Sequence, residues 1–142
     1  MNGEGSVSGE GSVSGEGSVS GEGSVSGELE PEALAERIAQ IASDRKALDV
    51  RVLDLRGVVA YTDFFVVCSG NTERQTKAIH DAVHQELKHS DGLLPRRAEG
   101  AREARWILLD YLDCVVHIFT PQAREFYRLE NLWGEVPARS VV

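Results

Sequence analysis

The run Phe64-Phe-Val-Val-Cys68 is the feature that most constrains the fold, because all of its residues are apolar. Successive side chains of a β-strand point to opposite faces of the sheet, so a half-buried strand alternates apolar and polar residues. A run without this alternation predicts a strand that is covered on both faces. Ser69-Gly70-Asn71 then ends the run with residues that are typical of turns.

Helical periodicity is found before and after this strand in the sequence. Pro31 suits the first position of a helix, where its missing N–H would have no partner anyway, and the helical pattern that follows predicts a helix over about 31–46. Asn71 or Thr72 can cap a second helix that reaches about residue 89. The positions expected to be buried are Leu34, Ile38 and Ile41 in the first helix and Ile79, Val83 and Leu87 in the second.

Three further segments, 49–55, 106–111 and 114–119, are rich in apolar and β-branched residues and predict strands. The link Leu112-Asp113 between the last two is short enough for an antiparallel hairpin. Leu93-Leu94 is expected to start a short edge strand, which Pro95 limits because proline cannot donate to a sheet.

The C-terminal part is expected to form one more helix from Pro121, and Gly134 and Pro137 are expected to end the ordered chain. The predicted order is helix, strand, strand, helix, two or three strands, and helix. This order predicts a single α/β domain of the α+β type, in which helices pack on a mixed sheet of four or five strands.

The N-terminal segment has a different composition. Residues 3–26 are four copies of Gly-Glu-Gly-Ser-Val-Ser, and Gly27-Glu28 follow them. Each copy offers a single Val for burial, whereas stacked repeats need enough apolar residues to build a core. We therefore expect residues 1–28 to be a disordered, solubilising tail and residues 29–142 to form the domain. A specific binding role for the tail is the alternative, but no motif in it points to one.

The tail also distorts the charge of the chain. The formal net charge is −8, but five acidic residues lie in the tail, so residues 29–142 carry 18 acidic and 15 basic residues. A mildly acidic domain is poorly suited to binding nucleic-acid backbone, because that affinity comes from neutralising phosphates. It suits a basic protein partner better. We expect no sequence-specific nucleic-acid partner, and the sequence leaves a homodimer open.

No apolar run approaches the roughly 18 residues of a transmembrane helix, and the N-terminus lacks the pattern of a signal peptide. Cys68 and Cys114 lie inside apolar runs, where free cysteine behaves as a small hydrophobic residue. A disulfide between neighbouring strands is the alternative. We expect a cytoplasmic protein with reduced thiols and no membrane partner. A nucleophilic Cys68 is disfavoured, because an activated thiol needs exposure and a nearby positive charge.

The segment His80-Asp-Ala-Val-His84 places two histidines four residues apart, which is the spacing of a zinc site on a helix. Metalloproteases have Glu where this chain has Asp81. A third ligand would have to be His89, His117 or a remote carboxylate, and no spacing supports any of them. Partly exposed structural histidines are therefore favoured, and we expect neither a metal nor a cofactor.

Carboxylates near strand ends suggest a different chemistry. Asp110 and Asp113 could hold Mg²⁺ for nucleotidyl or phosphoryl transfer, with Asp49 and Asp54 on another strand, while Ser69-Gly70-Asn71 could receive a phosphate at a helix N-terminus. Residues three apart on a strand point to opposite faces, however, whereas two metal ligands on one strand need a separation of two. A Mg-dependent nucleotidyl- or phosphotransferase is therefore the rival hypothesis.

Many of these runs together match a known pattern in order and spacing. In the first half they are Val52-Leu-Asp-Leu-Arg56, Thr62-Asp-Phe-Phe-Val-Val-Cys-Ser-Gly70, Arg74-Gln75 and Ala78-Ile79. In the second half they are Pro95, Glu99-Gly100, Trp106-Ile-Leu-Leu-Asp-Tyr111, Val116-His-Ile-Phe119, Arg124-Glu-Phe-Tyr-Arg-Leu-Glu130 and Leu132-Trp133. Each piece alone is common, but the ordered set over about residues 31–134 resembles the ribosomal silencing factor (Iojap-like) family.

This resemblance implies a fold related to nucleotidyltransferases but without their working site, and therefore a protein that is not an enzyme. It implies binding to the large ribosomal subunit through ribosomal protein fourteen. The bound protein would sterically block association with the small subunit and so act as a translation repressor when nutrients are short.

The resemblance also implies that Trp106, Asp110 and Tyr127 are partner contacts. Phe64 departs from the Tyr that is common in its run and lacks the hydroxyl. Trp and Tyr are residue types that anchor interfaces, and Trp106 follows a charged segment, so it is expected at the rim of the sheet. The alternative is that Trp106 and Trp133 are core residues.

Overall fold

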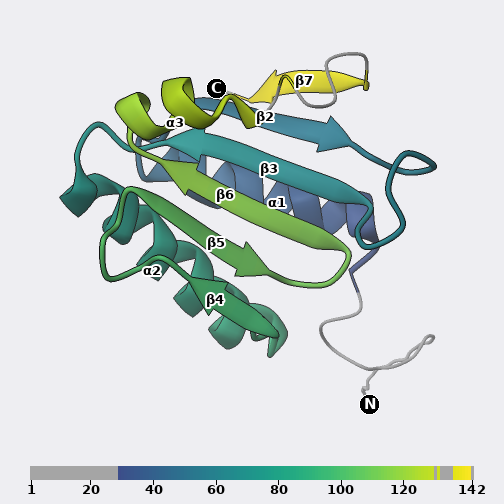
Figure 1. Cartoon of the computed structure of the whole chain (residues 1–142). Helices are drawn as coiled ribbons and strands as arrows, with labels where there is room; N and C mark the ends of the chain where they lie inside the picture. The colour runs from purple at the N-terminus through teal and green to yellow at the C-terminus, as the bar shows by residue number, and fades with distance from the viewer. Residues whose placement is uncertain (1–28, 130, 132–135, 142) are drawn as a thin grey trace. The chain divides into compact units, whose positions relative to one another are not determined.

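The computed structural model describes residues 29–129, 131 and 136–141 (Figure 1). The predicted tail and the predictions for Leu132, Trp133 and Gly134 lie outside these residues. The sheet belongs to a unit made of Pro31–Lys88 and Leu94–Val142. In chain order the elements are α1 (Pro31–Asp44), β2 (Leu48–Asp54), β3 (Phe64–Ser69), α2 (Glu73–Asp91), β4 (Arg97–Glu99), β5 (Trp106–Asp110), β6 (Cys114–Phe119), α3 (Pro121–Tyr127) and β7 (Ala138–Val141).

The described strands form one mixed sheet of six strands in the order β4-β5-β6-β3-β2-β7. Strand β3 is central, and all six of its residues are buried, which confirms the prediction from its apolar run. It pairs in parallel with β6 and antiparallel with β2. Helices α1 and α2 lie against one face of the sheet, whereas α3 lies on the other (Figure 1).

The helix-covered face is built as the periodicity predicted. All six helix positions that were expected to be buried are buried. Thr72 caps α2, since its hydroxyl oxygen accepts the backbone N–H of Gln75 at 3.1 Å. Among the described residues, no helix combines the length and the apolar character that a membrane span requires.

The expectation of four or five strands was wrong, because the described sheet has six. Order was expected to end at Gly134 and Pro137, yet β7 follows and pairs antiparallel with β2. Three of the four residues of β7 are exposed. Backbone pairing with the edge of the sheet therefore creates this strand, and its side chains give no burial pattern from which it could be predicted.

The position predicted for strand β4 was also wrong. Its start was expected at Leu93-Leu94, but the strand is Arg97–Glu99, beyond Pro95, and pairs antiparallel with β5. All three of its side chains are exposed, so its position again depends on backbone pairing. The two long helices end within about two residues of their predicted ends, at Asp44 and Asp91.

Candidate docking surface

The face of the sheet opposite α1 and α2 carries its own hydrophobic cluster. Its buried members are Leu53, Leu55, Phe65, Val67, Val115, Phe119, Ala123 and Leu129. Trp106 and Leu108 pack against this cluster while remaining partly exposed. Among the described elements, α3 is the helix on this face (Figure 1). Large apolar side chains therefore reach the surface here.

Five rings form a continuous row across this face, which we call the aromatic row. It runs through Tyr127, Trp106, His117, Phe65 and Tyr61, with centroid distances between successive rings of 4.6, 6.0, 4.5 and 6.4 Å. Ring contacts at such distances are favourable beyond the burial of area alone. The two end rings are about half exposed, at 47% for Tyr127 and 54% for Tyr61. The row thus links α3 and three strands into a surface that exists before any partner arrives.

Trp106 lies half-buried at the start of β5, in agreement with the expected place at the rim of the sheet. Its indole stacks on Phe119 with a centroid distance of 5.0 Å. Its Nε1–H donates a hydrogen bond to Nδ1 of His117 at 3.1 Å. Because the polar atom of the indole is already paired, the exposed part of Trp106 offers a partner mainly apolar surface.

His117 is the buried partner that fixes the indole. Since Nδ1 accepts from Trp106, the proton of the neutral ring must be on Nε2, which is buried without a hydrogen-bond partner among the described residues. Burial lowers the pKa of His117 to about 4, so the ring is neutral at neutral pH. The sequence pattern suggested His117 only as a possible metal ligand, so this role was not predicted. The available signal was a single polar residue inside an otherwise apolar strand.

Asp110 ends β5, and its side chain is buried, with 6% of the residue exposed. Its Oδ2 accepts from Nε of Arg96 at 3.2 Å, and its Oδ1 accepts the backbone N–H of Leu112 at 2.8 Å. Leu112 has a φ of 78°, a backbone conformation that is strained for a bulky residue, and it is 51% exposed. The carboxylate therefore holds the turn between β5 and β6 that presents Leu112 to solvent.

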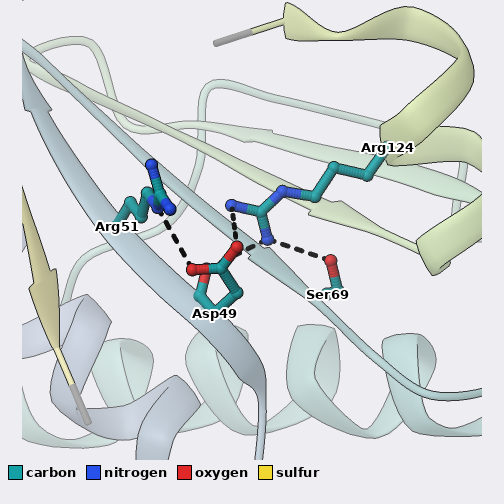
Figure 2. A network of polar contacts seen from close by, with 4 residues as sticks. All are labelled: Asp49, Arg51, Ser69 and Arg124. Carbon is teal, nitrogen blue, oxygen red and sulfur yellow. Dashed lines mark hydrogen bonds and ion pairs between the residues drawn. The ribbon is translucent and has the colours of Figure 1, made fainter.

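Arg124 fixes α3 to the sheet (Figure 2). Its Nη1 donates to the backbone oxygen of Asp49 and to Oγ of Ser69, both at 3.0 Å, and its Nη2 lies 3.4 Å from Oδ2 of Asp49. Only 11% of the Arg124 side chain is exposed, so the guanidinium is buried with its partners. These bonds join α3 to β2 and β3, and thereby place Tyr127 over Trp106.

The residues of the rival transferase site are not brought together. Ser69 pairs with Phe119 at the carboxyl end of β6, whereas Asp110 pairs with Val115 near its start. Four residues along a strand correspond to about 13 Å. Asp113 also lies at this far end, where its backbone oxygen accepts the N–H of Phe64 at 3.1 Å. Asp110 and Asp113 thus lie at the opposite end of the strands from Ser69, whereas Asp49 lies near Ser69 and pairs with Arg124.

The histidines of α2 and the two cysteines are placed as expected. His80 and His84 are partly exposed with ring centroids 5.9 Å apart, and Nδ1 of His80 lies 2.9 Å from a carboxylate oxygen of Asp81. Cys68 and Cys114 are free and buried. Burial raises the pKa of the Cys68 thiol to about 12, which makes it a poor nucleophile at neutral pH.

Comparison with known proteins identifies the family. A family model described as ribosomal silencing factor during starvation matches residues 28–141. The chain belongs to the ribosomal silencing factor family. It is 37% identical over 106 residues to the ribosomal silencing factor of Halalkalibacterium halodurans, a match that covers 75% of this chain and 90% of that protein. It is 34% identical over 109 residues to the ribosomal silencing factor of Bacillus subtilis, which covers 77% and 92% of the two chains.

A solved structure supports the fold of this ribosomal silencing factor family member. A crystal structure of a protein from Chromobacterium violaceum matches it with a TM-score of 0.72 and 29% sequence identity. The match covers 80% of this chain and 94% of that chain. The family model reaches from the segment before α1 to the last residue of β7, so every described element is included. The resemblance inferred from the ordered sequence runs is therefore confirmed.

Proposed function

We propose that this member of the ribosomal silencing factor family binds the large ribosomal subunit through ribosomal protein fourteen and sterically blocks association with the small subunit. Membership of the family supports the coarser statement, a ribosome-associated regulator of translation. The proposal of a specific docking site rests on the aromatic row, in which Trp106 lies between the exposed ring of Tyr127 and the buried ring of His117. The site of action is the cytoplasm, where the subunits join.

The geometry of Trp106 suits an interface anchor. Trp and Tyr bury a large area with few rotatable bonds, and a few such residues contribute most of the energy of an interface. The indole is held by Phe119 on one side and by the hydrogen bond to His117 on the other. Little side-chain entropy is therefore lost when a partner packs on it. Tyr127 lies beside it and enlarges the same contact.

Charge supports a basic partner. Residues 29–142 carry three more acidic than basic residues, so long-range attraction favours encounter with a basic protein surface. Asp110 contributes indirectly in this proposal, because its carboxylate faces Arg96 and the turn at Leu112. A direct contact of Asp110 with the partner is the alternative, and the variants Asp110→Ala and Asp110→Asn distinguish the two.

The protein acts by binding, without catalysis, in this proposal. The rival transferase would need Ser69 and Asp110 at one place, and the strand register holds them at opposite ends of β6. A direct assay decides between the two. Mg²⁺-dependent turnover of ATP or GTP by the wild-type protein that disappears in Asp110→Asn would overturn the non-enzymatic proposal.

Substituting Trp106→Ala tests the docking surface. Truncating a buried aromatic anchor typically costs about 2–4 kcal/mol of binding free energy, which corresponds to a weakening of roughly 30- to 1,000-fold. We expect the variant to bind isolated large subunits poorly and to leave subunit joining intact in sedimentation profiles. Trp106→Phe is the matched control, because it keeps an aromatic ring on Phe119 and loses the indole hydrogen bond and one of the two fused rings; it should retain most of the binding.

Thermal melting separates an anchor from a core residue. A core Trp→Ala change costs about 3–5 kcal/mol of stability, so a variant that matters only for packing melts early and binds normally at low temperature. If Trp106→Ala melts early but binds large subunits with wild-type affinity in the cold, the docking surface lies elsewhere.

A further inference from the structure

A crevice opens at the carboxyl ends of β3 and β6. These two strands are parallel neighbours, and each leads directly into a helix, β3 into α2 and β6 into α3. The two helices lie on opposite faces of the sheet (Figure 1). Where the connections from neighbouring parallel strands leave in opposite directions, they part and leave a crevice, and open α/β sheets bind ligands at this position.

The crevice holds a cavity of about 890 Å³, which is within the range of small-molecule sites. The lining residues that matter here come from both connections and from the segment before β5; they are Thr72, Arg74, Arg105, Gln122, Phe126 and Tyr127. The cavity is separate from the aromatic row except at Tyr127, which lines the cavity and also packs on Trp106.

The walls of the crevice are fixed by hydrogen bonds. The backbone N–H of Gly70 donates to the oxygen of Phe119 at 2.8 Å, and the N–H of Thr120 donates to the oxygen of Arg105 at 3.0 Å. A Cβ atom on Gly70 would lie 2.6 Å from the backbone nitrogen of Thr76, so the first turn of α2 packs directly on this glycine. The cavity is therefore preformed, which lowers the cost of binding.

Two guanidinium groups on the wall have no partner in the described part of the chain. The side chains of Arg74 and Arg105 make no hydrogen bond or ion pair with any residue that the structure describes. By contrast, Arg56, Arg96 and Arg124 each pair with a carboxylate. Glu73 also lines the cavity and opposes these charges, which leaves a net charge of one positive unit. The planar guanidinium group matches the geometry of a phosphate and binds it with charge-assisted hydrogen bonds.

An aromatic side chain completes the lining. Phe126 is 79% exposed, more than the other exposed large hydrophobic residues in the described part of the chain. It contacts Tyr127 edge to face at a centroid distance of 5.0 Å. Exposed aromatic rings stack on nucleobases of any sequence.

We propose that this crevice binds a nucleotide, with its phosphates at Arg74 and Arg105 and its base against Phe126. A single nucleotide suits the site better than a nucleic-acid strand, because the domain is mildly acidic and strand affinity needs many phosphate contacts. The proposal concerns binding alone, since Asp110 lies at the other end of the strands. It does not depend on the docking function proposed above.

Calorimetric titration of the full chain with ATP and GTP tests the proposal. Loss of one charge-assisted phosphate contact should weaken nucleotide binding about tenfold in Arg74→Gln and in Arg105→Gln. Arg102→Gln is the matched control, because it removes the same charge from the segment before β5 without lining the cavity, and it should bind like wild type. Phe126→Ala should weaken ATP binding but leave the binding of inorganic tripolyphosphate unchanged.

Three results would overturn the proposal. The first is the absence of saturable ATP or GTP binding at millimolar concentration. The second is equal weakening by Arg102→Gln and Arg74→Gln, which indicates general charge attraction. The third is tighter, steeply salt-dependent binding of an eight-residue oligoadenylate, which assigns the crevice to RNA. Sedimentation with Trp106→Ala reports on the docking function alone, so the two proposals fail separately.

Discussion

On the face of the sheet covered by α1 and α2, strand residues such as Val66, Ile107 and Ile118 are fully buried and have no polar side-chain atom. On the opposite face, Trp106 is partly exposed, and His117 is buried with one nitrogen unpaired among the described residues. A buried polar atom without a partner costs about 1–3 kcal/mol. The aliphatic face therefore contributes mainly to stability. The aromatic face keeps a destabilising buried histidine, which fixes the position of the exposed indole.

The largest expected effect comes from comparing one substitution on each face of the sheet. Ile38→Ala removes a fully buried side chain of α1 and should lower the free energy of unfolding by about 2–5 kcal/mol. Leu108→Ala, on the partly exposed face, should cost clearly less stability but weaken docking to large subunits. Urea unfolding and sedimentation measure the two quantities. Equal stability losses, with docking unchanged in both variants, would break the contrast between the faces.

His117 should make the stability of the fold depend on pH. Its pKa is about 4 in the folded protein and about 6.5 in an unfolded chain. Between these values the unfolded state binds a proton that the folded state excludes. Stability should therefore fall as pH falls from about 6.5 to about 4, by up to about 3 kcal/mol in total.

The variant His117→Gln should remove this part of the pH dependence, while its side-chain oxygen can still accept from Trp106. His84→Gln removes a histidine from α2 and should leave the dependence in place. Urea unfolding at several pH values measures the effect. An unchanged slope in His117→Gln would show that another group carries it.

Substitutions at Asp110 test whether its carboxylate contacts the partner or only holds the turn at Leu112. Asp110→Ala leaves the N–H of Leu112 without its acceptor and should cost about 1–3 kcal/mol of stability. Asp110→Asn keeps that acceptor, so it should recover most of the loss and bind large subunits normally. If Asp110→Asn instead melts like wild type but docks poorly, the carboxylate itself contacts the partner.

The smallest effect is expected for deletion of the N-terminal repeat segment. Deleting residues 1–28 removes a Gly, Ser and Glu segment whose composition offers little to bury. The melting temperature and the binding to large subunits should change little. A clear fall in either quantity would show that the repeats fold or bind.

The sequence predicted those parts of the fold whose side chains show a pattern. The apolar run of β3, the buried stripe of α2 and the cap at Thr72 all follow from local rules. Strands β4 and β7 were misplaced or missed because they are exposed and depend on backbone pairing with a distant edge.

The residues of the candidate site were likewise predictable only where a local sequence pattern marked them. The position of Trp106 at the start of β5 was predictable, and its role as a partner contact stays a prediction. His117 and Arg124 were missed because their partners lie on other elements: Trp106 on the neighbouring strand, and Asp49 and Ser69 at the ends of two strands. Such pairings depend on the register of the sheet, which one-dimensional patterns do not contain.

The two free cysteines can report on local unfolding of the protein. Cys68 and Cys114 have no exposed surface, and they lie on β3 and β6, the parallel pair at the centre of the sheet. Because only an accessible thiolate reacts, an alkylating reagent can label them only when the chain opens. Equal labelling rates would mean that the two central strands separate from the sheet as one cooperative unit. Unequal rates would reveal which strand is released first, without any denaturant and in the presence of ribosomes.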